Sequence, residues 1–214
     1  MVLGANDGIV SIACLVLGVA ASDAARNSIL TAGIAGLVAG AASMALGEYV
    51  SVSSQRDSEL SDIAKETREL RETPERELAE LTAIYQEKGL RHDLAREVAV
   101  ELTKKDALKV HLAEELGITE HNRAKPVEAS VTSAVSFVLG GAMPVLAVAI
   151  GNSTASRIWI TLIVSIGALV ALGSAGAHYG RASKRVSVRR VVIGGIIAMG
   201  FTMLVGKLFG AAVN

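Results

Sequence analysis

Acidic side chains at helical spacing stand out in the middle of this sequence, because together they could hold a divalent metal ion. The candidates are carboxylates and one imidazole: Glu66, Glu69, Glu77, Glu80, His111 and Glu115. They form three pairs whose members are three or four residues apart. Residues at that spacing lie on one face of a helix, so each pair would present its two side chains together.

Carboxylates stacked on one face repel each other unless a cation lies between them. Mn²⁺ and Fe²⁺ prefer carboxylate oxygens, often with an imidazole, and facing helices with such pairs build metal sites in bundles. The same region contains Arg68, Arg71 and Arg76, which could pair with acids on an ordinary solvated face. Spacing alone leaves both interpretations open.

Three residues in or beside apolar segments are candidates for an ion pathway. Asp7 lies in the segment Gly-Ala-Asn-Asp-Gly. An acid inside a membrane costs about 2.5–3.5 kcal/mol or more and commonly binds cations or exchanges protons. Met44 offers a thioether, which suits softer transition metals, and Glu48 follows at the end of the same segment. The alternatives are a headgroup location for Asp7, simple packing for Met44 and solvation for Glu48.

The elements that must position these residues are long apolar segments. Five runs are nearly free of charge: 8–22, 29–47, 129–152, 158–180 and 191–206. Because a helix needs about 20 apolar residues to cross a bilayer, we predict an all-α membrane protein with five transmembrane helices. The first run is long enough only if it includes Asp7. A signal peptide is the alternative there, but residues 1–6 contain no basic residue.

Charge is distributed unevenly along the 214 residues. Residues 51–128 carry 13 basic and 18 acidic side chains, a net charge of −5, whereas the remainder carries only 8 and 3. This pattern excludes a single water-soluble globule, a basic nucleic-acid binder and a disordered chain. We predict three parts: helices 1 and 2 of the membrane region in 1–50, a cytoplasmic helical metal-binding insert in 51–128, and helices 3 to 5 in 129–214.

Within the insert, breaker residues predict where helices begin and end. We expect the second transmembrane helix to continue through residue 72, because no breaker interrupts it. Thr73-Pro74 predicts a new start with threonine as N-cap, and Gly89 and Gly117 predict two ends. Asp106 is a possible local cap. The expected apolar core is Leu78, Leu81, Ile84, Leu94, Val98, Leu102, Leu108 and Leu112.

Basic residues predict the orientation in the membrane. The segment 181–190 contains five lysines or arginines, whereas 23–28 and 153–157 contain one arginine each. Basic loops remain in the cytoplasm, so we expect the N-terminus and the insert inside and the C-terminus outside. The sequence shows no targeting extension, which favours the plasma membrane of a prokaryote.

Two motifs give this sequence a family resemblance. Gly-Ala-Asn-Asp-Gly-Ile-Val-Ser at 4–11 and Ala-Gly-Ala-Ala-Ser-Met-Ala-Leu-Gly-Glu-Tyr-Val-Ser-Val at 39–52 closely resemble the vacuolar iron transporter family. The similarity covers nearly the whole chain. It implies a homodimer with five transmembrane helices per subunit and an ion path between the subunits. It also implies that divalent iron leaves the cytosol in exchange for protons.

The resemblance carries over to individual positions. Asp7 and Met44 match the family's pathway residues, and its metal-binding glutamates match Glu66, Glu69, Glu77, Glu80 and Glu115. Two positions depart from the pattern. A pathway glutamate of the family falls on Gly36, and paired methionines fall on His111 and Leu112. Relatives also usually begin further upstream.

We therefore expect a transporter that exports Fe²⁺ or Mn²⁺, each as a transported and a regulatory ion, with no tightly bound cofactor. Its other partners would be protons, the lipid bilayer and a second copy of the chain, and it would not be an enzyme. The alternative is a membrane-anchored metal sensor or structural protein without transport. A di-iron enzyme would need Glu-x-x-His pairs, and the sequence has none.

Overall fold

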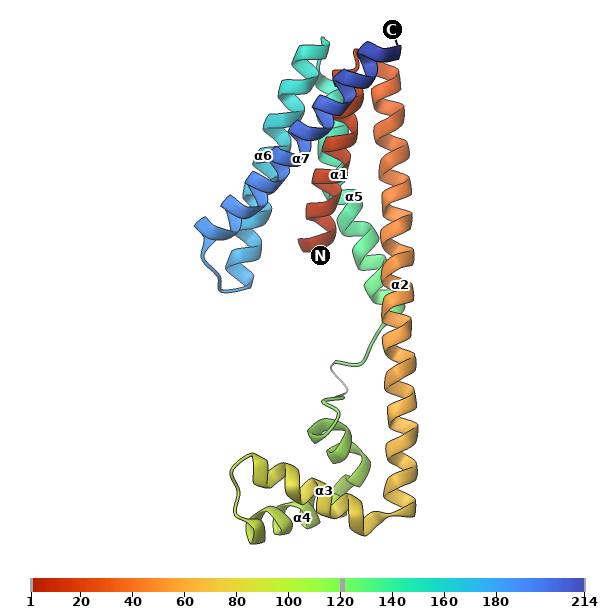
Figure 1. Cartoon of the computed structure of the whole chain (residues 1–214), viewed down its shortest axis with the longest axis vertical. Coiled ribbons are helices and arrows are strands. Elements are labelled where there is room, and N and C mark those ends of the chain that lie inside the picture. The colour runs from red at the N-terminus through yellow and green to blue at the C-terminus, as the bar shows by residue number, and fades with distance from the viewer. Residues whose placement is uncertain (1, 120–121, 214) are drawn as a thin grey trace. The chain divides into compact units, whose positions relative to one another are not determined.

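The computed structural model describes residues 2–119 and 122–213, and this part of the chain contains helices and no strand. The helices are α1 (Val2–Ala21), α2 (Arg26–Glu72), α3 (Pro74–Glu87), α4 (His92–Glu114), α5 (Pro126–Ile150), α6 (Thr154–Tyr179) and α7 (Lys184–Val213) (Figure 1). Five of them, α1, α2, α5, α6 and α7, are long and apolar enough to cross a membrane. The prediction of an all-α protein with five membrane helices is confirmed.

The chain divides into two compact units. Unit 1 comprises Met1–Tyr49 and Val127–Asn214, and unit 2 comprises Val50–Pro126. Helix α2 contributes to both units. Its 47 residues are more than twice the number that one crossing needs. As expected from the absence of a breaker, the helix continues without interruption to Glu72.

Unit 1 is built around α1. This helix buries the side chains of Ile9, Ile12, Val16 and Leu17, each at most 2% exposed, and it packs against α6 and α7. Glycines allow its backbone to approach its neighbours closely. A Cβ at Gly8 would lie 2.2 Å from a carbonyl oxygen of α5. Small residues therefore set the spacing of this bundle, as is common where helices meet in membranes.

Unit 2 has its own small apolar core between α3 and α4. The buried members are Leu81, Tyr85, Ala95 and Ala99. Two alanines four residues apart give α4 a shallow face on which α3 can pack closely. Leu94, which the sequence analysis placed in the core, is 43% exposed because that alanine face is turned inward instead.

Helix ends in unit 2 follow the expected breakers, with one difference. Gly89 and Gly117 have positive φ angles of 97° and 66° and terminate helical segments, as is common for glycine. Pro74 begins α3, but the Thr73 side chain does not cap its backbone N–H groups. Thr73 therefore occupies the predicted N-cap position, but its hydroxyl donates to the carbonyl oxygen of Glu69 at 3.1 Å instead of capping α3.

A substitution in α7 tests the close packing of unit 1. A Cβ at Gly206 would lie 1.9 Å from the carbonyl oxygen of Gly18 in α1. We expect Gly206→Ala to lower the melting temperature of the purified protein, since overpacking of this kind costs about 1–3 kcal/mol. Gly194→Ala is the matched control on the same helix, because a Cβ there meets nothing within 4 Å. Equal melting temperatures for the two variants would contradict this packing.

Candidate metal centre

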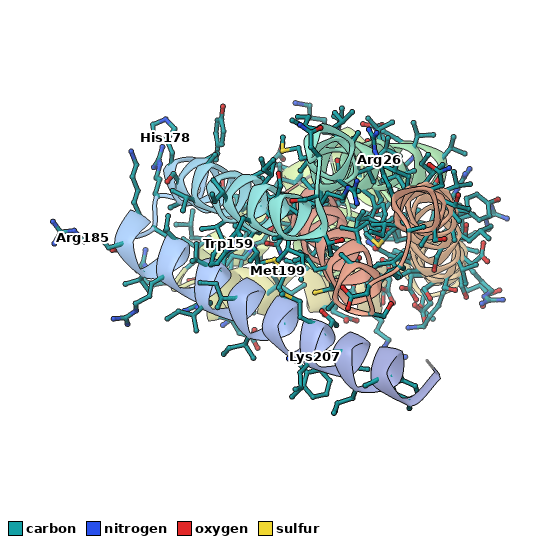
Figure 2. All side chains as sticks on the ribbon, turned by 90° about the horizontal axis from the view of Figure 1, so that it is seen from above. Arg26, Trp159, His178, Arg185, Met199 and Lys207 are labelled. Atoms are coloured by element: carbon teal, nitrogen blue, oxygen red, sulfur yellow. The ribbon has the colours of Figure 1, made fainter. Side chains whose placement is uncertain are left out.

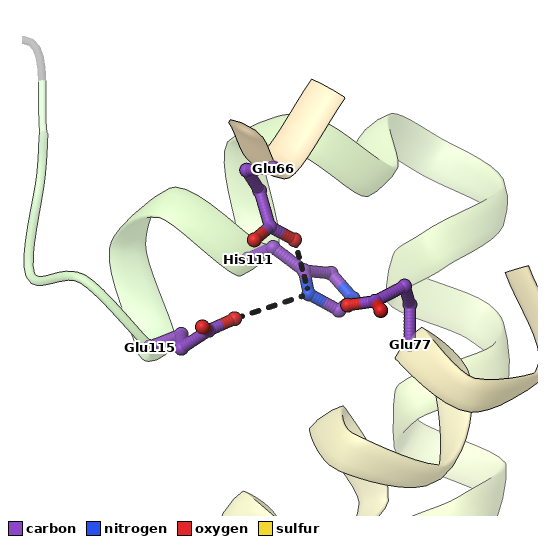
Figure 3. A group of neighbouring side chains, drawn as sticks. All are labelled: Glu66, Glu77, His111 and Glu115. Atoms are coloured by element: carbon purple, nitrogen blue, oxygen red, sulfur yellow. Dashed lines mark ion pairs between the residues drawn. The ribbon is translucent and has the colours of Figure 1, made fainter. Parts of the chain in front are cut away.

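Four side chains from three helical segments of unit 2 converge on one point (Figure 3). Glu66 belongs to α2, Glu77 to α3 and His111 to α4, and Glu115 is the C-cap residue directly after α4. One possible ligand atom from each lies within 4.8 Å of the others. Because these residues are distant in sequence, the group forms only when the three segments fold together.

His111 and Glu66 form the buried centre of this group. Their side chains are 0% and 3% exposed, and His111 Nδ1 lies 2.9 Å from Glu66 Oε1. The two atoms are not aligned as a hydrogen bond, and Glu115 Oε2 is 3.7 Å from the same nitrogen. Within the described residues, neither nitrogen of His111 has a hydrogen-bond partner. An unsatisfied buried polar group costs about 1–3 kcal/mol, so this arrangement favours an additional ligand.

A divalent cation fits the donor set. Three carboxylates and one imidazole are the hard and borderline ligands that Fe²⁺ and Mn²⁺ accept. Opposite oxygen ligands of an octahedral ion of this class stand about 4.2 Å apart, so donors within 4.8 Å need only a small contraction. The cation would also neutralise the acids and satisfy the orphaned nitrogen and oxygen atoms.

Burial and mutual repulsion both raise the pKa values of acids in the cluster. Burial raises the pKa of Glu66 above its ordinary value, repulsion from Glu115 raises it further, and attraction to His111 opposes the change. Burial also raises the pKa of Glu115, with repulsion from Glu80 as the next cause. Both acids therefore hold protons more tightly in the folded protein than in the unfolded chain.

The turn between α2 and α3 places Glu66 beside Glu77. Helix α2 ends at Glu72, and Pro74 starts α3 directly after a single residue. That residue, Thr73, also has its hydroxyl 3.4 Å from Glu77 Oε1. Thr73 thus helps to orient a cluster acid. The sequence analysis missed this role, because a threonine before proline has the same signature as an ordinary N-cap.

A break in α4 places His111 and Glu115. At Asp106 the backbone is extended, with φ −166° and ψ 91°, and Asp106 Oδ1 accepts a hydrogen bond from the Lys109 backbone N–H at 3.0 Å. The carboxylate therefore caps a new helical segment, as the sequence analysis suggested. The four-residue spacing then puts His111 and Glu115 on one face of it.

Glu69 and Glu80, the other two predicted metal ligands, lie outside the group of four. Glu69 forms an ion pair with Lys65 at 3.4 Å, and Glu80 is exposed. Their charges nevertheless act on the cluster, since Glu69 contributes to the raised pKa of Glu66 and Glu80 to that of Glu115. Each of the sequence pairs Glu66–Glu69 and Glu77–Glu80 therefore contributes one acid to the group of four and one acid outside it.

The predicted pathway residues lie in unit 1. Asp7 is partly buried on α1 and accepts a hydrogen bond of 2.6 Å from the Ser11 hydroxyl. Met44 packs against the apolar cluster around Ile12 and Phe137. Glu48 is partly buried at the end of the apolar part of α2.

Gly36, the position where the family resemblance implies a glutamate, faces α1. A Cβ at Gly36 would lie 2.3 Å from the Cδ2 atom of Leu15. The leucine side chain fills the space that a larger residue would need. The glycine therefore belongs to the packing of α1 against α2.

Comparison with known proteins gives consistent similarities over almost the full length. A sequence profile of the VIT family matches residues 1–207. The chain is 44% identical over 207 residues to a protein of Acanthamoeba castellanii named vacuolar iron transporter, covering 97% of this chain and 76% of that protein. It is 36% identical over 211 residues to vacuolar iron transporter homolog 5 of Oryza sativa subsp. japonica, covering 99% and 79%.

A third relative is VIT-like transporter 1b of Glycine max, which is 34% identical over 211 residues, or 99% of this chain and 75% of the relative. All three relatives come from eukaryotes, and two have vacuolar in their names. The expectation of a prokaryotic plasma membrane finds no support in them.

The raised pKa values of Glu66 and Glu115 give the metal-free protein a specific pH dependence. Their folded pKa values exceed the ordinary 4.5, so their contribution to stability is complete below pH 4.5 and is lost as pH rises through the folded values. We expect Glu66→Gln to reduce the fall in melting temperature above pH 4.5. Glu75→Gln, on the exposed surface of α3, is the control and should follow the wild type. Identical curves for all three proteins would contradict a raised pKa of Glu66 in the folded protein.

Asp106 offers a second test of the same site. Removing this cap with Asp106→Ala should cost about 1 kcal/mol and loosen the segment that carries His111 and Glu115. We therefore expect weaker binding of Mn²⁺ to the full chain by calorimetric titration. Asp106→Asn, which can still accept the Lys109 N–H, should retain most of the affinity. Equal loss in both variants would indicate that charge, and not the cap, matters.

Proposed function

Because the chain belongs to the VIT family of membrane transporters, and is a metal-ion transporter and not an enzyme, we propose that it exports Fe²⁺, and also Mn²⁺, from the cytosol in exchange for protons. The observation that carries this proposal is the cluster of Glu66, Glu77, His111 and Glu115. Buried donor atoms of Glu66, His111 and Glu115 lack partners. A transporter needs a place where the hydrated ion is first captured, and this cluster has the chemistry for that step.

In the proposed mechanism, residues 51–128 act as a cytoplasmic metal-binding domain. The cluster takes up the ion and releases protons, since carboxylates and imidazole bind metal only when deprotonated. Glu69 and Glu80, at the edge of the cluster, attract the ion electrostatically. Because their side chains are more exposed, they exchange water and cations readily.

Asp7, Met44 and Glu48 form the proposed path through the membrane. Two copies of the chain would double this set around a symmetry axis, which supplies more ligands than one copy holds. The ion passes from Glu48 to the Met44 thioether and the Asp7 carboxylate. A proton from the opposite side then neutralises Asp7, which weakens ion binding and completes the exchange. We propose the N-terminus and residues 51–128 inside and the C-terminus outside, because the basic segment 181–190 favours the cytoplasmic side.

Flux into proteoliposomes tests transport and the role of Asp7. We expect Fe²⁺ and Mn²⁺ uptake into vesicles with an acidic lumen, and little uptake without the pH gradient. Asp7→Asn should abolish the gradient-dependent part, because an amide does not exchange a proton. Asp23→Asn is the matched control, since Asp23 has a φ of 59°, which asparagine also adopts readily. Full coupled transport by Asp7→Asn would exclude this residue from the path.

Titration of flux against metal concentration tests the capture site. Glu66→Gln removes a buried ligand, so we expect the KM for the metal to rise about tenfold or more while the maximal rate changes little. Glu75→Gln again serves as the surface control. An unchanged KM would remove the cluster from the uptake step, and metal binding without any flux would favour the sensor alternative.

A further inference from the structure

Five basic side chains in the α6–α7 connection and the first two turns of α7 take no part in the proposed transport mechanism. They are Arg181, Lys184, Arg185, Arg189 and Arg190, and all are exposed. Within the described residues no ion pair and no side-chain hydrogen bond involves any of them. Residues 153–214 contain no acidic side chain at all. Helices α6 and α7 and the segment between them therefore carry a concentrated positive charge with no acidic side chain of their own.

The geometry of α6 places this charge at a membrane surface. Trp159 and Tyr179 are 65% and 84% exposed, and they lie 20 residues apart near the two ends of the helix. Twenty residues of helix span about 30 Å, the thickness of the hydrocarbon core. Exposed Trp and Tyr favour the two interfaces, so the basic segment that follows Tyr179 lies at headgroup level.

An apolar pocket opens beside the basic segment. It has a volume of about 450 Å³ and lies between the start of α1, the second half of α6 and the start of α7. Its lining includes Val2, Leu3, Asn6, Gly176, Ser187 and Val191. In Figure 1 the start of α1 and the α6–α7 connection lie at the same end of the unit 1 bundle.

The pocket combines apolar walls with unsatisfied polar groups at one side. Asn6 Oδ1 is buried without a hydrogen-bond partner. The first turn of α7 also leaves backbone N–H groups without helical acceptors, which favours an anion there. Lys184 shares the face of α7 that carries Ser187 and Val191, because the three are spaced by three and four residues. Arg181 lies in the turn directly after α6, with a φ of 51°, and Ala177 in the last turn of α6 is another lining residue.

We propose that this pocket and the basic segment bind one anionic phospholipid. Lys184, Arg181 and the start of α7 would hold the phosphate, Asn6 would bond a polar group of the headgroup or glycerol, and an acyl chain would occupy the apolar walls. Basic pockets between membrane helices are typical sites for such headgroups. The proposal requires only that unit 1 lies in a membrane, and it does not depend on the transported ion or on proton exchange.

Thermal melting of the purified full chain in detergent tests this site. Phosphatidylglycerol should raise the melting temperature in a saturable manner, because a ligand that binds the folded state stabilises it. Phosphatidylcholine with the same acyl chains should have much less effect, and inorganic phosphate almost none. Equal stabilisation by the two lipids would overturn the charge assignment. Stabilisation by inorganic phosphate alone would overturn the assignment of a lipid to this pocket.

One variant and one matched control locate the phosphate part of the site. Lys184→Gln should weaken phosphatidylglycerol binding about fivefold, the effect of one cation near an anionic headgroup. Arg185→Gln makes the same charge change one residue away, and the Arg185 side chain points away from the helices (Figure 2). Arg185→Gln should therefore have little effect on phosphatidylglycerol binding. Equal weakening of phosphatidylglycerol binding by Lys184→Gln and Arg185→Gln would indicate non-specific electrostatic attraction to the basic segment. That result would overturn the proposed site.

Gly176→Leu tests the acyl-chain part of the pocket. A Cβ at Gly176 meets only Val2 Cγ1, at 3.4 Å, so the new side chain would extend into the pocket without displacing backbone. We expect it to abolish the lipid-dependent stabilisation and to leave the melting temperature in detergent alone close to that of the wild type. If Gly176→Leu lowers that melting temperature, counting bound lipids on wild type and Lys184→Gln by native mass spectrometry decides the same question. Full lipid binding by Lys184→Gln would refute the proposal.

Discussion

Close approach of backbones to α1 is the constraint on which the bundle of unit 1 depends. Gly8 meets the carbonyl of Phe137, and Gly18 meets Gly206, at distances that leave no room for a Cβ. Between membrane helices there is little hydrophobic driving force, so such contacts and the packing around them provide much of the cohesion. They also fix the position of Asp7, which precedes Gly8 and has little freedom to move along or around the helix axis.

Unit 2 follows an opposite principle at its centre. Instead of maximising contact, it brings Glu66, Glu77 and Glu115 near His111 and leaves several donor atoms without partners. The apolar contact of α3 with α4 must offset this cost in the metal-free state. Binding of an ion at such a site is weakened if the ligand side chains must first rearrange. Here the donors are already gathered.

The sequence predicted the helices well and the cluster only in outline. Charge-free runs and breakers at Pro74, Gly89 and Gly117 determine local structure directly, so the element bounds follow from composition. Helical spacing identifies carboxylates that share a face, but it does not say which member of a pair points inward. That choice depends on the Thr73–Pro74 turn and on the direction in which α3 leaves α2. Leu94 was misplaced for a similar reason, because two small alanines allow a closer helix contact than a leucine does.

The extended residue at Asp106 separates two tasks within one helix. Ala95 and Ala99, which belong to the core shared with α3, precede it, while His111, the buried Leu112 and the adjacent Glu115 follow it. Substitutions at well-separated positions usually have additive effects. A substitution at His111 or Glu115 is therefore expected to leave the Ala95–Ala99 part of the contact with α3 in place. Replacing His111 or Glu115 would thus change two of the four donors, while Glu66 and Glu77 remain on α2 and α3.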